Sequence, residues 1–258
     1  MSLATTVAGP ETPGFPPVLL VHGLFGQGRN LGVIARALAE TRRVVSVDMR
    51  NHGDSFWDDD HSYDALAGDL AQVIQDHGGL ADVVGHSMGG KAAMWLALTH
   101  PGLVRRLAVL DIAPVAYGHT QSSLIDAMEQ ADFSTAATRS QADAALSEFV
   151  EDHSVRAFLL QSLDLKADPP RWRMNLAALR DQMPNLTGWP EPGGAAGFSG
   201  PMLVLAGADS DYVDDTGRAA IAALFPQSLV EQFSGAGHWL HAERPADVAG
   251  RIVGFVND

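Results

Sequence analysis

Residues Gly85–Gly89 read GHSMG, the pattern Gly-x-Ser-x-Gly in which a serine can act as a nucleophile. The segment follows a short β-type run, Asp82–Val84, and opens a stretch with helical spacing, Met88–Thr99. On a sharp strand-to-helix turn the serine hydroxyl is exposed, and glycines are needed on both sides because a side chain there would collide with the neighbouring strand and helix. We therefore predict that Ser87 is a nucleophile. The alternative is a glycine-rich turn that only caps the helix.

A histidine follows the last predicted strand, in the sequence GAGHW at residues 235–239. When a catalytic set follows the chain order serine, acid, histidine, the base lies on this loop. We therefore predict that His238 accepts the serine proton. His86 and His241 are alternatives. We expect His86 to pack inside the turn and His241 to lie on the surface at the start of the last helix.

Three aspartates could orient that histidine. Asp111 ends one predicted strand, whereas Asp209 and Asp211 follow a later strand, which is the more usual place. The usual acid position, three residues after Gly207, holds Ser210 instead. Asp111 is preferred, and Asp209 and Asp211 stay open; each could instead cap a helix or anchor the inserted segment.

An oxyanion requires hydrogen-bond donors beside the nucleophile. The segment His22–Phe25 (HGLF) ends the predicted strand Val18–Val21, where a loop can supply one backbone donor. We predict that the N–H groups of Leu24 and Met88 form the oxyanion hole. The alternative is an ordinary strand-to-helix turn.

A phosphate-binding loop and a metal site fit the sequence less well than a serine nucleophile does. Gly85–Lys91 also matches the phosphate-binding pattern G-x-x-x-x-G-K, but Ala92 follows where a metal-binding Ser or Thr is required. The acidic run Asp58–Asp60 with His61 could bind a metal, although such runs are usually solvated loops. We therefore expect no metal and no cofactor. Lys91 is expected to be a surface lysine; its alternative roles are to hold the inserted segment through a salt bridge or to bind a substrate anion.

The elements that must position these residues alternate between short apolar runs and stretches of helical period. This pattern predicts an α/β protein with a doubly wound, mostly parallel sheet covered on both faces. An edge strand is expected at Leu3–Val7. The remaining strands are expected at Val18–Val21, Val44–Val47, Asp82–Val84, Leu107–Leu110, Met202–Leu205 and Leu229–Phe233, and the helices at Leu31–Ala39, Tyr63–His77, Met88–Thr99 and Ala246–Phe255.

The alternation stops between residues 112 and 200, so we expect a core of residues 1–111 and 201–258 with a helical insertion, residues 112–200. The insertion shows no convincing strand and closes with a connector rich in proline and glycine, Pro190–Gly200. Its helices are expected at Gln121–Gln130, Gln141–Phe149, Val155–Leu163 and Pro170–Met183.

Composition excludes several classes of protein. The chain of 258 residues contains no cysteine, so a thiol nucleophile and cysteine-based metal sites are ruled out. The net charge of −14 disfavours nucleic acid and anionic membranes as partners. The first basic residue is Arg29, so no signal peptide is expected, and we expect a cytoplasmic protein. The sequence leaves open whether it is a monomer or a homodimer.

These features together resemble the α/β-hydrolase superfamily, from Val18 to the C-terminus. Within it, the chain resembles a subgroup of small bacterial carboxylesterases with acyl-CoA thioesterase activity. The segments that carry this resemblance are His22–Gly28 with Asn30-Leu31, Val47–Ser55, Gly85–Lys91, Leu110–Val115 with Tyr117, and Gly235–Glu243.

The resemblance implies a serine hydrolase that cleaves carboxylic esters or acyl thioesters through an acyl-enzyme. The insertion is rich in apolar side chains, a minority of which are expected to line a pocket for a short to medium acyl chain. The resemblance also implies that the insertion is a helical lid and that the aspartate at position 111 is the acid. A perhydrolase or a carbon–carbon bond hydrolase would use the same residues, and a non-catalytic small-molecule receptor could use the same fold.

Overall fold

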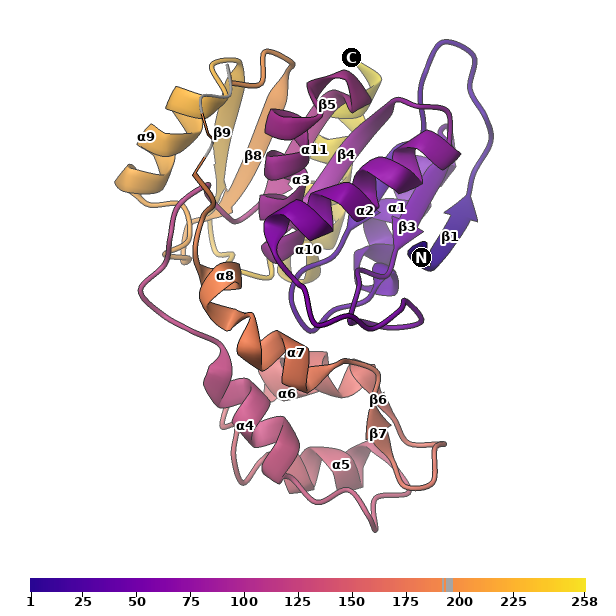
Figure 1. Ribbon diagram of the computed structural model, residues 1–258, viewed down its shortest axis with the longest axis vertical. Coiled ribbons are helices and arrows are strands. Elements are labelled where there is room, and N and C mark those ends of the chain that lie inside the picture. Colours follow the sequence, from indigo (N-terminus) through magenta and orange to yellow (C-terminus); the bar gives the residue numbers. More distant parts are fainter. Residues whose placement is uncertain (192, 194–196) are drawn as a thin grey trace.

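The fold is an α/β sandwich around one seven-stranded sheet, seen here in a computed structural model that describes residues 1–191, 193 and 197–258 (Figure 1). The strand order is β1-β3-β2-β4-β5-β8-β9, and only β1 runs antiparallel to its neighbour. This confirms the predicted doubly wound, mostly parallel sheet. The strands are β1 (Thr5–Ala8), β2 (Val18–Val21), β3 (Val44–Val47), β4 (Ala81–His86), β5 (Val104–Leu110), β8 (Met202–Gly207) and β9 (Ser228–Phe233).

Helices cover both faces of the sheet, which explains why its central strands are apolar on both sides. In β2, Leu19 and Val21 belong to the core under α2 (Tyr63–Asp76) and α3 (Met88–Thr99). The alternate residues of the same strand belong to the core under α1 (Gly32–Ala39) and α11 (Pro245–Asn257). The edge strand begins two residues later than expected. The remaining core elements are η1 (Gly28–Leu31), η2 (Pro101–Leu103), α9 (Asp215–Leu224) and α10 (Leu240–Glu243).

The insertion between β5 and β8 forms a separate layer below the carboxyl ends of the strands (Figure 1). It is not purely helical, because β6 and β7 pair in a two-stranded antiparallel sheet. The expectation of four helices without a strand is therefore wrong here. Two-residue strands are too short to show a period, and prolines 169 and 170 end the helical pattern between them. The elements are α4 (Ser122–Gln130), α5 (Arg139–Leu146), α6 (His153–Leu159), η3 (Leu160–Ser162), β6 (Leu163–Asp164), β7 (Arg171–Trp172), α7 (Leu176–Asp181) and α8 (Met183–Thr187).

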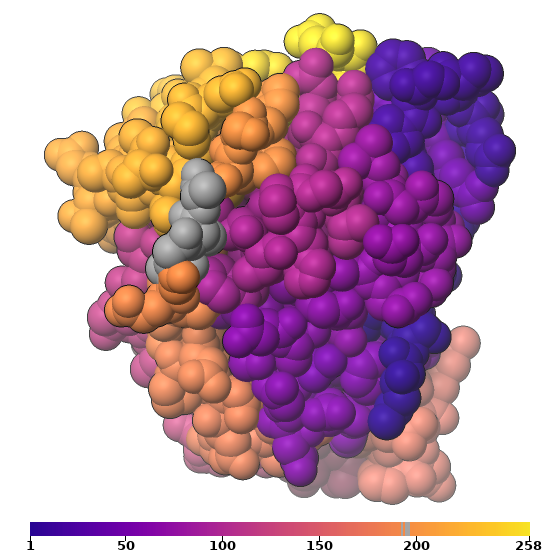
Figure 2. All heavy atoms as spheres, turned by 45° about the horizontal axis from the view of Figure 1, so that its top comes forward, coloured from indigo at the N-terminus to yellow at the C-terminus, as the bar shows by residue number. Residues whose placement is uncertain are grey.

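The insertion packs directly against the core. The hydroxyl of Tyr63, the first residue of α2, donates to the carbonyl of Leu186 at 2.9 Å, and Figure 2 shows the orange end of the insertion against the purple segment of the core. The predicted connector, Pro190–Gly200, lies partly outside the described residues. In the part of the chain that the structure describes, no helix is both long and apolar enough to cross a membrane.

Candidate active site

Ser87 lies on the turn between β4 and α3 in a left-handed backbone conformation, with φ of 53°. The glycines on either side are required by contact. A Cβ on Gly85 would lie 2.5 Å from the carbonyl oxygen of Gly89, and one on Gly89 would lie 2.3 Å from that of His22. The turn therefore closes only with glycine at both positions, and it lifts the serine side chain out of the sheet.

The structure brings Ser87, His238 and Asp111 into one hydrogen-bonded chain. His238 Nε2 lies 2.9 Å from Ser87 Oγ, and His238 Nδ1 lies 2.8 Å from Asp111 Oδ2. Asp111 follows β5 and is fully buried, whereas the His238 side chain on the loop after β9 is 17% exposed. A carboxylate only accepts, so Nδ1 carries the proton and Nε2 is free to accept one from the serine hydroxyl.

Asp111 is held by two further donors. Its Oδ1 accepts the N–H of Gly207 at 2.8 Å, and its Oδ2 also accepts the hydroxyl of Ser210. Ser210 thus occupies the position where the acid is usually found, and it donates to Asp111, which follows another strand. Asp209 and Asp211 are exposed, and within the described ranges neither carboxylate bonds to His238.

The two competing histidines both lie inside the protein. His86 Nε2 donates to the backbone carbonyl of His238 at 2.9 Å, so this side chain supports the loop. His241 was expected on the surface, but it is buried, with its ring 4.3 Å from that of His86. Burial, followed by the neighbouring His238, lowers the pKa of His241 to about 4 and keeps it neutral. The sequence shows only that His241 lies near the start of a helix. It does not show that His241 is on the side of the short α10 that faces the protein interior.

The predicted oxyanion donors line the same cavity as Ser87. In residues 1–191, 193 and 197–258, no protein acceptor takes a hydrogen bond from the N–H of Leu24 or Met88. The next amide, that of Phe25, donates to His52 Nε2 at 3.1 Å. Because this bond fixes the loop one residue beyond Leu24, His52 is a positioning residue that sequence reasoning missed. Its only signal was its place in the Asn-His-Gly run.

His22 and His52 form a pair of fixed acceptors beneath this loop. His22 Nε2 accepts the N–H of Met49 at 2.9 Å, while its Nδ1 donates to the carbonyl of Gly23 at 2.8 Å. His52 Nδ1 donates to the carbonyl of Arg50 at 2.9 Å. Burial lowers the pKa of His22 to about 4 and that of His52 to about 3. Both rings therefore stay neutral near pH 7, as their acceptor roles require.

A cavity of about 330 Å³ opens beside Ser87 between core and insertion. Its walls are mostly apolar or aromatic, which suits an acyl group better than a charged one. The ring of Tyr212 stacks on that of His238 at 4.0 Å between centroids, a contact that the sequence did not reveal. The insertion contributes Val155, Phe158, Met183 and Leu186 to the walls.

Lys91 is buried, which corrects the expectation of a surface lysine. Its Nζ donates to the carbonyls of Thr187 (3.1 Å) and Gly188 (2.7 Å), and it lies 4.6 Å from the Tyr117 ring centre. It therefore joins α3 to the insertion through carbonyl oxygens, without a carboxylate partner in the described chain. Burial lowers the pKa of this lysine to about 7.

The acidic run with His61 does not assemble a metal site. The His61 side chain is buried, and its Nδ1 lies 3.2 Å from Asn51 Nδ2. Across the residues that can be described, no group of three or more His, Asp or Glu side chains is arranged to hold a metal ion.

Comparison with known proteins agrees with this architecture. The family model for the alpha/beta hydrolase fold matches residues 16–245. The sn-1-specific diacylglycerol lipase ABHD11 of Mus musculus is 38% identical over 250 residues, which cover 93% of this chain and 81% of that protein. Esterase YbfF of Escherichia coli K12 is 38% identical over 244 residues, which cover 94% of this chain and 93% of the esterase.

The solved structure of a marine microorganism esterase superposes with a TM-score of 0.92 at 34% identity, covering 98% of this chain and 99% of that one. Similarity of sequence and of structure therefore extends over nearly the whole chain, insertion included. The chain belongs to the α/β-hydrolase fold family and has small esterases among its relatives.

Proposed function

We propose that the protein is a serine hydrolase that cleaves carboxylic esters or acyl thioesters through an acyl-enzyme. The observation that carries the proposal is the continuous hydrogen-bonded chain from Asp111 through His238 to Ser87 Oγ, which ends at an apolar cavity. This arrangement is the one that nucleophilic acyl transfer requires. Relatives named as an esterase and as a lipase support the same reaction class.

The mechanism follows from the hydrogen bonds. Ser87 Oγ attacks the acyl carbonyl while His238 Nε2 takes the hydroxyl proton, and the carbonyl oxygen becomes negative. The N–H groups of Leu24 and Met88 donate to that oxygen. His238 then gives the proton to the departing alcohol or thiol. Water attacks the acyl-enzyme by the same route, with His238 again as base.

Asp111 stabilises the imidazolium that forms in both steps. It is fully buried, and the donors Gly207 N–H and Ser210 Oγ–H hold its carboxylate toward Nδ1. Its negative charge therefore acts where water does not screen it. This role requires no metal and no organic cofactor.

The acyl half of the substrate is set by the cavity. Its volume of about 330 Å³ and its apolar walls suit a short to medium acyl chain. A thioester differs from an ester only in the leaving group, so the thioesterase activity implied by sequence resemblance uses the same residues. Hydrolysis rates over a series of p-nitrophenyl esters of increasing acyl length would define the preferred acyl group. Rates for acyl thioesters with that acyl group would then show which leaving group is preferred.

The decisive experiment concerns the nucleophile. Ser87→Ala removes the attacking oxygen, so ester hydrolysis and labelling by a fluorophosphonate probe should both vanish while the melting temperature stays close to that of the wild type. Unchanged hydrolysis by the folded variant would overturn the proposal. Absence of both activities in the wild-type protein would instead favour a non-catalytic receptor.

A further inference from the structure

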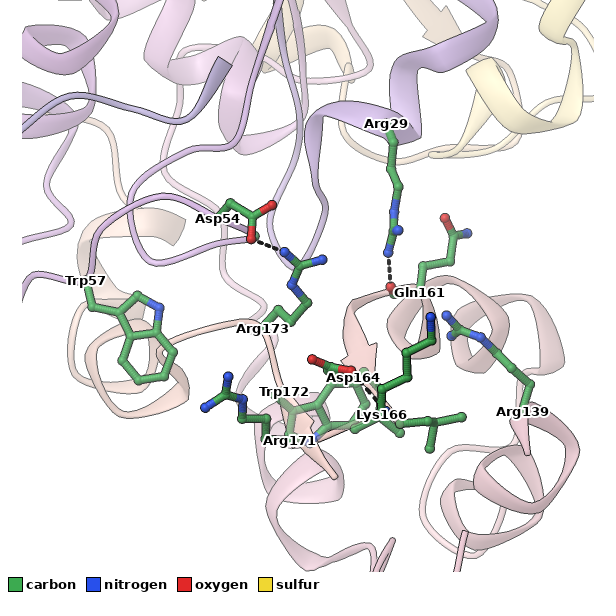
Figure 3. A pocket seen from close by; sticks show the side chains of 13 residues that line it. Arg29, Asp54, Trp57, Arg139, Gln161, Asp164, Lys166, Arg171, Trp172 and Arg173 are labelled. Carbon is green, nitrogen blue, oxygen red and sulfur yellow. Dashed lines mark hydrogen bonds and ion pairs between the residues drawn. The ribbon is translucent and has the colours of Figure 1, made fainter. Parts of the chain in front are cut away.

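A second cavity, of about 790 Å³, lies at the seam between core and insertion and shares no lining residue with the cavity beside Ser87. Figure 3 shows cationic side chains around it that come both from the core and from the insertion. We call it the basic pocket; its charged lining residues are Arg29, Asp54, Arg139, Asp164, Lys166, Arg171 and Arg173.

The basic pocket holds more positive charge than its own carboxylates neutralise. Asp54 pairs with Arg173. No carboxylate in the described residues lies within ion-pair distance of the other four cations, Arg29, Arg139, Lys166 and Arg171. Asp164 is the one remaining carboxylate, and it accepts the backbone N–H of Lys166 at 3.0 Å. The lining therefore carries an excess of about three positive charges.

This excess is unusual in a chain whose net charge is −14. Like charges gathered around one cavity repel one another, and acidic residues are abundant enough to have paired them. The arrangement is instead what an anionic ligand requires. Guanidinium groups bind phosphate oxygens with two parallel hydrogen bonds, whereas a single carboxylate would neutralise only one of the three charges.

Both the core and the insertion contribute cations to the basic pocket. Arg29 extends from η1 in the core and donates to the backbone carbonyl of Gln161. Arg139 begins α5, and Arg171 lies in β7. In Figure 3 the ends of Arg139 and Lys166 point toward each other below Gln161, while Arg171 points to the side where Trp57 stands.

We propose that the basic pocket binds a phosphate-rich anion, a diphosphate or triphosphate group, held jointly by Arg29 of the core and by Arg139, Lys166 and Arg171 of the insertion. Trp57, which is 54% exposed, offers a face at the rim on which a planar group attached to the phosphates can stack. This site shares no lining residue with the cavity beside Ser87, and its binding of an anion can be measured whether or not the protein hydrolyses esters.

The basic pocket also adjoins the loop that carries Leu24. Two of its lining residues, Gly53 and Gln161, are direct neighbours in the chain of His52 and Ser162. His52 Nε2 accepts the N–H of Phe25, and the Ser162 hydroxyl donates to the carbonyl of the same residue at 3.0 Å. An anion that joins the two layers would therefore stabilise the seam that holds this loop.

The test is calorimetric titration of the full-length protein with inorganic tripolyphosphate at low salt. The wild type should bind, and added salt should weaken binding because the contacts are ionic. Arg139→Ala and Arg171→Ala should each raise Kd about tenfold or more, the usual effect of losing a charged hydrogen bond. Both side chains are exposed, so the variants are expected to fold, and their melting temperatures without ligand check this.

Arg218→Ala is the matched control. Arg218 lies on α9, far from β6 and β7 (Figure 1), and makes no side-chain hydrogen bond or ion pair within the described part of the chain. It removes the same charge, so its Kd should equal that of the wild type. No binding by the wild type, or an equal loss in the Arg218→Ala and Arg171→Ala variants, would overturn the proposal.

Kinetics then identify where the phosphates come from. If they belong to a separate molecule, tripolyphosphate changes the hydrolysis of a neutral p-nitrophenyl ester in the wild type and not in Arg171→Ala. If they belong to the substrate's leaving group, tripolyphosphate leaves that ester unaffected and competes with a thioester whose thiol half is phosphorylated. Either result supports the site, whereas identical effects on wild type and Arg171→Ala contradict it.

Discussion

Asp111→Asn tests the proposed acid, for which the sequence also offers Asp209 and Asp211. The substitution preserves shape, but the surroundings decide how the new amide lies. The N–H of Gly207 points at Oδ1, so the amide oxygen must occupy that position, and the NH₂ group then faces His238 Nδ1. A donor facing Nδ1 forces the imidazole proton onto Nε2, where the ring can no longer accept the proton of Ser87.

The expected magnitude is large because nothing nearby can compensate. Asp111 is fully buried, so water cannot replace the lost acceptor. The equivalent change in a serine protease lowers kcat by about 10⁴, which corresponds to about 5.5 kcal/mol of transition-state stabilisation. We expect a similar loss of kcat for Asp111→Asn.

Asp209→Asn and Asp211→Asn are the matched controls, since both side chains are exposed. Solvent screens charges at such positions, so each should lower kcat less than about tenfold. The assay is steady-state hydrolysis of one p-nitrophenyl ester by the four proteins, with melting temperatures to verify folding. The reasoning fails if Asp111→Asn keeps kcat within about tenfold of the wild type, or if either control collapses instead.

His238→Ala should lower kcat for the same ester by about 10⁴ or more, because it removes the proposed base. His241→Ala should lower kcat less than about tenfold. The reverse ranking would show that His241, and not His238, is the base. The pKa of Lys91 is lowered from 10.5 to about 7, so above pH 7 the unfolded chain holds a proton that the folded chain lacks. The unfolding free energy of the wild type should therefore rise with pH from about 7 to about 10, by up to ~1.4 kcal/mol per pH unit relative to Lys91→Met. Urea denaturation of both proteins checks this, and parallel pH profiles would contradict it. Asp82→Ala removes the carboxylate that pairs with Arg42 and leaves that buried guanidinium without its counter-charge, so it should lower the unfolding free energy by about 3–5 kcal/mol. Glu11→Ala removes the carboxylate of an exposed ion pair and should lower the unfolding free energy by less than about 1 kcal/mol. Equal urea midpoints for these two variants would contradict the assigned burial.

The sequence by itself determined the fold class and the places of the reactive groups. The alternation of apolar runs and helical stretches encodes a parallel sheet, because strands buried on both faces must be apolar throughout. The glycines around Ser87 encode the turn, because only they avoid the backbone contacts at 2.5 Å and 2.3 Å. Chain order then placed His238 on the loop after the last strand, and the structure brings these residues together with Asp111.

Tertiary structure alone decided how these groups are supported. Nothing local to Lys91 or His241 reveals that each is buried, since the segments that cover them come from elsewhere in the chain. The hydrogen bond from Ser210 to Asp111 joins residues 99 positions apart, and the one from Phe25 to His52 joins residues 27 apart. The basic pocket likewise collects cations that are scattered in sequence. Periodicity and turn patterns are local properties of a chain, whereas burial and charge balance depend on which distant segments meet when it folds.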